Sequence, residues 1–321
     1  MGHEALLGWL RAAGEATRLR LLLLCARGEL TVSELTQILG QSQPRVSRHL
    51  KVLCDAGLLE RVREGSSVFY GVTQSGKAAQ GVRAILELAG GSDARLGRFD
   101  DRLAGVVAQR REAAARYFDR NAAQWDAIRS LHIDEAEVER AMIGLLPRSG
   151  QGDLLDIGTG TGRILLLLAA HVRRALGVDL SREMLAVARA NLDRPGFGHC
   201  AVRKGDMYDL PVAAGSADIV TIHQVLHFAD RPADVIAEAA RVLRPGGVLL
   251  VADFAPHQLE YLRDQHAHRR LGFADQHVHD WFLRAGLEPD DIVHLPGKPL
   301  TVSLWRARRP AASRAGQAGA A

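Results

Sequence analysis

Apolar residues recur every three or four positions through the first quarter of the chain, which is the spacing of helices with one buried face. The pattern occurs in three short runs separated by polar segments, and it predicts three short helices that share one small core. The apolar positions are Leu19, Leu22, Leu23 and Leu24, then Leu35, Ile38 and Leu39, and then Val46, Leu50 and Leu53.

The last of these helices is predicted to have one buried face and one cationic face. At about 100° per residue its apolar positions share a narrow arc, whereas Ser47, Arg48 and Lys51 point the other way. No acidic residue occurs between positions 35 and 54, so the exposed face offers charge and hydrogen bonds without repelling phosphate. Gly40-Gln41-Ser42-Gln43 forms the turn before this helix. A helix-turn-helix is therefore predicted.

Residues 56–72 alternate apolar and polar positions about a Gly-Ser turn, which predicts a two-stranded wing. Together, Ser47-Arg48-His49-Leu50-Lys51-Val52-Leu53 and Ala56-Gly57-Leu58-Leu59 resemble the winged helices of the arsenic-repressor (ArsR/SmtB) family, over residues 3–90. The resemblance implies a homodimer on a double-stranded DNA operator, with residues 4–13 and 74–88 at the dimer interface. The residues expected to contact DNA are Gln43, Arg45, Ser47, Arg48, His49, Lys51, Arg63 and Ser66.

Some ArsR proteins sense metals at one of two sites, and this chain lacks the expected ligands of both. The family's best-known thiolate sensor has two cysteines on the helix predicted to open with Glu29-Leu30, where this chain has Thr31 and Ser33. A hydroxyl does not replace a soft thiolate ligand. The family's alternative sites lie on the last helix of the domain, and residues 74–88 contain no histidine. We expect no metal at these positions.

Short apolar runs in the second half predict a series of strands, and the first of them ends in a glycine-rich loop. Residues 154–157 are followed by Gly158, Gly160 and Gly162, spaced two apart, and then by a helix from Arg163. Glycines permit positive φ and close backbone approach to a ligand, and the helix offers free N–H groups. A dinucleotide fingerprint places its third glycine three positions after the second. The spacing here favours S-adenosylmethionine over NAD.

Carboxylates follow the next two predicted strands. Asp179 ends the run 175–178, where a second parallel strand would deliver a group that accepts both ribose hydroxyls. Asp206 follows the strand 201–203 and could accept from the adenine amino group, with Met207 packing on the ring. Residues 218–222 then form a strand, and residues 243–251 a helix end, a turn and another strand.

This ordered series resembles a class I S-adenosylmethionine-dependent methyltransferase of the small-molecule type found in quinone biosynthesis, over residues 115–256. The resemblance implies an α/β fold in which the winged helix-turn-helix is followed by a Rossmann-like doubly wound domain. Residues 117–126 resemble the helix that caps the cofactor in this group. The cofactor-binding residues so implied are Asp156, Gly158, Gly160, Gly162, Asp179, Leu180, Asp206, Met207 and Tyr117.

The methyl acceptor and a base are harder to assign, because methyl transfer mostly requires positioning and exclusion of water. His223 and His227 follow the fourth strand, near the cofactor's methyl group, and are the catalytic candidates. In the resembled group a histidine there often supports the loop, which favours a structural role. Six further histidines between residues 257 and 294 have no standard metal spacing. Residues 266–270 could instead bind an anionic substrate group.

Three specific substrates are disfavoured. An arsenite methyltransferase would need several cysteines in the catalytic domain, which has only Cys200. Amino-group DNA methylation normally uses an Asn/Asp-Pro-Pro-aromatic segment after the fourth strand, where this chain has Ile222-His223-Gln224. Cytosine C5 methylation needs a Pro-Cys nucleophile, which the chain lacks. DNA is therefore expected to be the docking site and a small molecule the methyl acceptor.

Length and charge agree with this organisation. The 321 residues can bury two cores, and the net charge of +4 gives mild support to nucleic-acid contact. Three cysteines form no spaced pair, which fits a reducing cytoplasm, and no apolar run has the length of a membrane span. We expect a DNA-binding and dimerisation domain over residues 1–92, a helical connector over 93–116, a methyltransferase domain over 117–308 and a disordered tail over 309–321.

Three functions remain open at this point. The first is a bifunctional protein that methylates a metabolite and represses genes. The second is a sensor that binds S-adenosylmethionine or S-adenosylhomocysteine as an effector without catalysis. In the third, the winged helix serves only for dimerisation, and replacement of Arg48 and Lys51 should then leave DNA binding unchanged.

Overall fold

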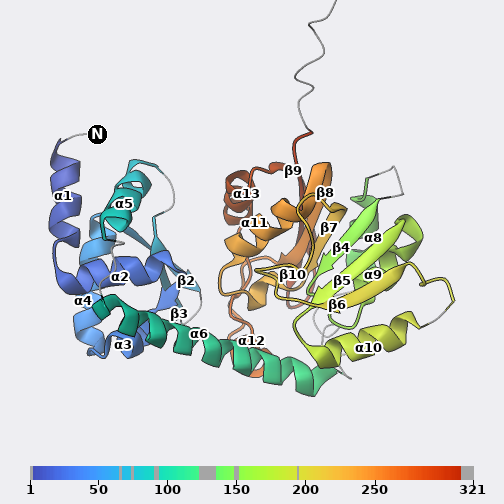
Figure 1. Cartoon of the computed structure of the whole chain (residues 1–321), viewed down its shortest axis with the longest axis horizontal. Helices are drawn as coiled ribbons and strands as arrows, with labels where there is room; N and C mark the ends of the chain where they lie inside the picture. The colour runs from blue at the N-terminus through green and yellow to red at the C-terminus, as the bar shows by residue number, and fades with distance from the viewer. Residues whose placement is uncertain are drawn as a thin grey trace, which may run out of the picture. The chain divides into compact units, whose positions relative to one another are not determined.

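The computed structural model describes residues 3–64, 67–73, 76–89, 94–122, 135–147, 152–193 and 195–311. The chain forms two compact units, Met1–Ala113 and Ala114–Ala321 (Figure 1). The boundary between them lies within helix α6 (Ala94–Asn121), which contains residues 94–116 of the segment expected to be a helical connector. Of the tail expected to be disordered, residues 312–321 lie outside the described residues.

The first unit is a winged helix-turn-helix. Its three antiparallel strands have the order β1-β3-β2, and β2 with β3 forms the wing. Its helices are α1 (His3–Ala13), α2 (Ala16–Ala26), α3 (Val32–Leu39), α4 (Gln43–Asp55) and α5 (Gly76–Ala89). Its strands are β1 (Leu30–Thr31), β2 (Leu59–Glu64) and β3 (Ser67–Val72).

Helix α3 begins later than the predicted opening at Glu29-Leu30. Leu30 pairs with the wing strand β3, and Thr31 caps the helix by accepting from the backbone N–H of Glu34. The Glu34 carboxylate in turn accepts from the Thr31 N–H at 2.8 Å, so both halves of a capping box are present. These two bonds start the helix at Val32.

Most of the core of this unit consists of the apolar positions predicted from periodicity, but Leu19 and Leu23 are only half-buried, and Leu21, which was not predicted, is fully buried. Leu35, Ile38, Val46, Leu50 and Leu53 are fully buried. Helices α1 and α5 also pack closely, because a Cβ added at Gly81 would lie 2.5 Å from the Trp9 ring. A side chain at position 81 would therefore separate the two helices.

The second unit is a seven-stranded sheet with the order β6-β5-β4-β7-β8-β10-β9. The first five strands are parallel, and β10 is antiparallel to both of its neighbours. The strands are β4 (Asp153–Ile157), β5 (Arg174–Asp179), β6 (Cys200–Lys204), β7 (Ala217–His223), β8 (Leu243–Phe254), β9 (Glu288–Pro296) and β10 (Thr301–Arg308).

Helices cover both faces of this sheet, so the predicted doubly wound fold is confirmed. Alternate strand residues contribute to two separate cores: Leu155 and Ile157 of β4 face one, and Leu154 faces the other. Helices α11 (Pro232–Val242) and α13 (Asp275–Arg284) pack in the first core. The second contains residues of α8 (Glu135–Gly144) and α9 (Arg163–Leu168). Other helical segments are α10 (Arg182–Leu192), α12 (Tyr261–His266), η2 (Ala169–His171) and η3 (Leu226–Phe228).

Strand β8 starts earlier than predicted. The expected turn around Gly246 is incorporated in the strand as an irregularity: Ala217 pairs with Leu243, but Ile219 pairs with Val248. Gly246 has φ 81°, a left-handed conformation that glycine adopts readily. The sequence signal for a turn is therefore correct, and the turn forms a bulge within the sheet.

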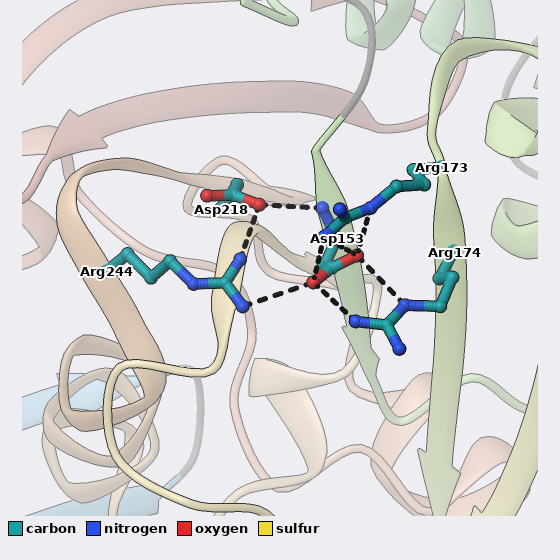
Figure 2. A network of polar contacts seen from close by, with 5 residues as sticks. All are labelled: Asp153, Arg173, Arg174, Asp218 and Arg244. Atoms are coloured by element: carbon teal, nitrogen blue, oxygen red, sulfur yellow. Dashed lines mark hydrogen bonds and ion pairs between the residues drawn. The ribbon is translucent and has the colours of Figure 1, made fainter.

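The amino ends of four strands are joined by an ionic network (Figure 2). Asp153 at the start of β4 accepts hydrogen bonds from Arg173, Arg174 and Arg244. Arg244 also donates to Asp218 at the start of β7, and Asp218 accepts from the Asp153 N–H at 2.8 Å. The network lies at the edge of the sheet opposite the glycine loop.

None of the helices in the described part of the chain has the length and apolar character that a membrane crossing requires.

Candidate functional site

The glycine loop follows β4 at the carboxyl edge of the sheet. Gly158, Gly160 and Gly162 have φ values of 69°, 52° and 81°, so all three predicted glycines are left-handed. The N–H of Gly158 donates to the Val178 carbonyl of β5 at 2.8 Å. A Cβ at Gly158 would lie 2.4 Å from the side chain of Val225, just after β7. The loop is thus held tightly between the two neighbouring strands, which requires glycine at its first position.

Asp179, at the end of β5, lies directly beside this loop. Its carboxylate accepts from the Gly160 N–H at 2.8 Å and from the Ser181 N–H at 2.9 Å. Leu180, the next residue, is a large apolar side chain with 49% of its surface exposed. A carboxylate that accepts hydroxyl donors, next to an exposed apolar surface, suits the ribose and base of a nucleoside.

Asp156, Asp206 and Met207 lie in less exposed settings. Asp156 is buried, and its Oδ1 accepts from the Thr221 hydroxyl of β7 at 2.7 Å. Asp206 follows β6 and accepts from the Tyr208 N–H at 3.0 Å, and Met207 packs against the sheet core. The side chain of Tyr117, the remaining predicted cofactor residue, lies outside the described residues.

The two candidate catalytic histidines, His223 and His227, are both buried. His227 Nδ1 lies 2.8 Å from Asp253 Oδ1, and the Asp253 carboxylate also accepts from the backbone N–H groups of His227 and Phe254. The His227 ring stacks on His268, with 4.1 Å between centroids. These contacts tie the loop after β7 to the end of β8 and to the segment after α12. They favour a positioning role for His227.

Sequence reasoning missed two residues at this edge. Asp253 is fully buried at the carboxyl end of β8, and the rule that identified Asp156 and Asp179, an acid at the end of an apolar strand, would also have found it. Gln224 follows β7 directly, with a left-handed φ of 54° and a buried side chain. No sequence signal indicates that conformation, because it is uncommon outside glycine.

The histidines of residues 257–294 do not converge on one point. His294 contacts the Ser303 hydroxyl at 2.8 Å and Asp275 at 3.3 Å. His268 instead stacks on the ring of His227. Burial lowers the pKa of His266. Within the described ranges, no three histidine, cysteine, aspartate or glutamate side chains are grouped closely enough to hold a metal ion.

The predicted DNA-contacting residues of α4 differ in their exposure. Gln43, Arg45, Arg48 and Lys51 are exposed, and the three cations are spaced by three residues along one face. Lys51 Nζ forms an ion pair with Asp55 at 2.9 Å.

Two other predicted DNA contacts on the α4 helix are half-buried, Ser47 and His49, and His49 Nδ1 lies 3.5 Å from Glu15. Arg63 is exposed on wing strand β2, and Ser66 lies outside the described residues. The side chains best placed for phosphate and base contact are therefore Arg45 and Arg48.

A parallel sheet with one antiparallel strand, a glycine loop after its central strand and an acid after the next strand define a Rossmann-like nucleotide-binding domain. Two family models match the chain. Residues 155–251 match a methyltransferase domain, and residues 15–61 match the bacterial regulatory proteins of the arsR family. The N-terminal unit therefore contains an arsR-type helix-turn-helix domain, and the second unit contains a methyltransferase domain, which implies S-adenosyl-L-methionine as its cofactor.

Two curated relatives are methyltransferases by name. An arsenite methyltransferase of Aquipseudomonas alcaligenes is 35% identical over 155 residues, which cover 44% of this chain and 42% of that protein. A ubiquinone/menaquinone biosynthesis C-methyltransferase of Rubrivivax gelatinosus is 33% identical over 150 residues, covering 46% of this chain and 58% of the relative. The chain thus spans about half the length of the curated relatives it matches.

Solved structures share the methyltransferase fold. A putative methyltransferase in complex with the Trm112 methyltransferase activator of Haloferax volcanii aligns with a TM-score of 0.52 and 22% identity. The alignment covers 60% of this chain and 97% of that chain. At this identity the likeness concerns the fold alone.

Proposed function

We propose that the chain is a transcriptional regulator that also transfers a methyl group from S-adenosylmethionine to a small molecule. The observation that carries this proposal is the bond from the Gly160 N–H to the Asp179 carboxylate, which sets a ribose-binding acid beside a left-handed glycine loop. The same chain carries exposed arginines on the second helix of a helix-turn-helix. A pure DNA-binding protein needs no such glycine loop.

The cofactor supplies an electrophilic methyl group, and the residues of this chain bind and orient it. Asp179 would accept the ribose hydroxyls, and the glycines would allow the backbone to approach the methionyl end closely. Asp156 would contribute to cofactor binding from its buried position in the sheet, where its carboxylate also accepts a hydrogen bond from Thr221 of the neighbouring strand. His227, fixed by Asp253, would shape the loop next to the reacting methyl group and help to exclude water.

The methyl acceptor in this proposal is a small molecule and not DNA. The loop after β7 has Gln224 and Val225 in place of a Pro-Pro-aromatic segment, and Cys200, the one cysteine of the second unit, follows a histidine. Although one relative is named an arsenite methyltransferase, a single cysteine cannot provide the several thiolates expected for arsenite.

DNA docking in this proposal uses a homodimer in the cytoplasm. Helices α1 and α5 carry exposed leucines, with Leu10 51% exposed and Leu88 89% exposed. Burial of such apolar groups between two copies would be favourable. A dimer would present two α4 helices to half-sites about one helical turn apart.

The experiment that tests the proposal is fluorescence anisotropy of the full chain on its own upstream DNA, titrated with S-adenosylmethionine and separately with S-adenosylhomocysteine. An effector shifts an equilibrium only by its different affinities for the two states, so different DNA affinities would establish linkage between the domains. Equal affinities would mean that the cofactor state is not the signal, and the acceptor would then be the expected inducer.

A second assay separates the enzyme from a sensor without catalysis. The protein is incubated with methyl-labelled S-adenosylmethionine and a metabolite extract, and labelled small molecules are sought. Tight cofactor binding without any transfer would support the sensor instead. Absence of cofactor binding would overturn both alternatives.

A further inference from the structure

Gln224 combines two features that a purely structural residue avoids. Its backbone is left-handed, with φ 54°, which is strained for a residue other than glycine. Its side chain is 94% buried, and its amide Nε2 has no hydrogen-bond partner among the described residues. Buried amides normally have partners, and an orphaned one lowers the stability of the fold. Neither cost is explained by packing.

The position of Gln224 indicates which ligand would compensate for these costs. Its backbone N–H donates to the Ala252 carbonyl of β8 at 2.7 Å, and the next residue, Val225, packs against Gly158. In the strand order β5-β4-β7, Asp179 lies on one side of the glycine loop and Gln224 on the other. A nucleoside ligand with its ribose at Asp179 would therefore extend across the loop and bring its opposite end to Gln224.

We propose that Gln224 Nε2 donates a hydrogen bond to the carboxylate at the methionyl end of S-adenosylmethionine or S-adenosylhomocysteine. The proposal deepens the proposed function and rests on it. An amide N–H is a donor and therefore pairs with the carboxylate and not with the ammonium group of the same ligand. Hydrogen bonds to charged acceptors are stronger than neutral ones, so the free-state cost is recovered on binding. The strained backbone then holds a binding residue in place before the ligand arrives.

The test is isothermal titration calorimetry with two ligands that differ only at this end. S-adenosylhomocysteine carries the amino-acid group, whereas 5′-methylthioadenosine has the same nucleoside and sulfur without it. In Gln224→Met, which keeps the length but loses the donor, we expect S-adenosylhomocysteine to bind about tenfold to a hundredfold more weakly. The affinity for 5′-methylthioadenosine should change less than twofold. Gln224→Glu should weaken S-adenosylhomocysteine further, because two carboxylates repel.

Ala267 provides a matched control for backbone strain. It is the other non-glycine residue with a left-handed φ, 56°, in the described part of the chain. Gln224→Gly and Ala267→Gly both relieve this strain, but only the first removes an amide. We expect only Gln224→Gly to lose affinity for S-adenosylhomocysteine. Gln224→Gly also keeps the test valid if Gln224→Met does not fold, since glycine suits this φ best.

Specific outcomes overturn the assignment. Unchanged S-adenosylhomocysteine affinity in the folded Gln224 variants would exclude the contact, and an equal loss for both ligands would mean that Gln224 only supports the loop. If the affinity for S-adenosylhomocysteine depends on Asp179 but not on Gln224, this inference fails and the proposed function stands. If the unsubstituted protein binds neither ligand, the proposed function fails with it.

Discussion

His227 donates from Nδ1 to the carboxylate of Asp253 over 2.8 Å, and solvent reaches almost none of either side chain. Asp253 also accepts from two backbone N–H groups, so a single carboxylate pairs three donors. The pair connects the loop after β7 to the end of β8. That loop carries Val225, which packs against Gly158 of the glycine loop. The geometry of the candidate cofactor site therefore depends on the contact between Asp253 and His227, two residues after Val225.

Replacement of Asp253 should therefore destabilise the fold strongly. Asp253→Ala leaves three buried donors without their acceptor, and we expect the free energy of unfolding to fall by about 3 kcal/mol or more. Urea denaturation followed by circular dichroism measures this. Asp264→Ala, at an exposed acid of α12, is the matched control and should change stability by less than about 0.5 kcal/mol. A loss below 1 kcal/mol in Asp253→Ala would contradict the structural role of the pair.

The Asp153 network gives a prediction on pH. Hydrogen bonds from Arg174, together with those from Arg173 and Arg244, hold the pKa of Asp153 well below its usual range, although burial opposes them. A carboxyl group whose pKa is lower in the folded state stabilises the fold at pH values above its unfolded pKa, near 4. This contribution is lost as the pH falls through that region toward the folded pKa.

Asp153→Asn should accordingly lower the free energy of unfolding by about 1 to 3 kcal/mol at pH 7, and by progressively less below about pH 4. Denaturant titrations of both proteins at a series of pH values give the difference directly. The control is Asp55→Asn, which breaks the exposed pair with Lys51 and should cost at most about 1 kcal/mol at any pH. A difference between Asp153→Asn and the unsubstituted protein that does not vary with pH would refute the linkage.

Elements with a strong local signal could be predicted from the sequence. Strands β4, β5, β6, β7 and β8 correspond to the short apolar runs in the sequence, whereas β9 and β10 were not predicted. Gly158, Gly160 and Gly162 are left-handed as expected, because this conformation depends on residues next to one another. The start of α3 could also be predicted, since Thr31 and Glu34 have the spacing of a capping box. For this helix, the comparison with thiolate sensors led to an earlier predicted start, at Glu29-Leu30, than the residues themselves indicate.

Contacts between distant segments could not be predicted in the same way. The hydrogen bond of His227 with Asp253 and the approach of His49 to Glu15 join separate elements and depend on the packed fold. The left-handed backbone of Gln224 has no local cause, because glutamine does not prefer it. Such departures from local preference are expected to concentrate at functional sites, which is why Gln224 carries the inference on the cofactor.

Asp179 should determine cofactor affinity. Asp179→Ala removes the acceptor of the ribose hydroxyls and releases the Gly160 N–H, so S-adenosylhomocysteine should bind more weakly by roughly 1 to 3 kcal/mol. Calorimetry on the full chain measures the change, and thermal unfolding verifies that the variant is folded. Asp193→Ala, at the exposed end of α10, is the control and should bind as the unsubstituted protein does. Unaltered binding in Asp179→Ala would remove the ribose assignment.

The exposed cations of α4 lead to the last prediction, on DNA. Lys51 forms an ion pair with Asp55, whereas Arg48 takes part in none of the ion pairs found among the described residues. Its guanidinium can therefore contact phosphate or a base without first breaking another bond. Arg48→Ala should weaken binding to the upstream DNA and, if the contact is to phosphate, reduce the slope of log affinity against log salt by about one.

Arg189→Ala is the control for this measurement, because Arg189 is an exposed cation of α10, outside the winged helix and its expected dimer interface. Anisotropy titrations at several salt concentrations should separate the two variants. Lys51→Ala should have a smaller effect than Arg48→Ala, since its ion pair with Asp55 competes with phosphate. If Arg48→Ala and Arg189→Ala bind DNA equally well, α4 is not the recognition helix, and the winged helix would serve dimerisation alone.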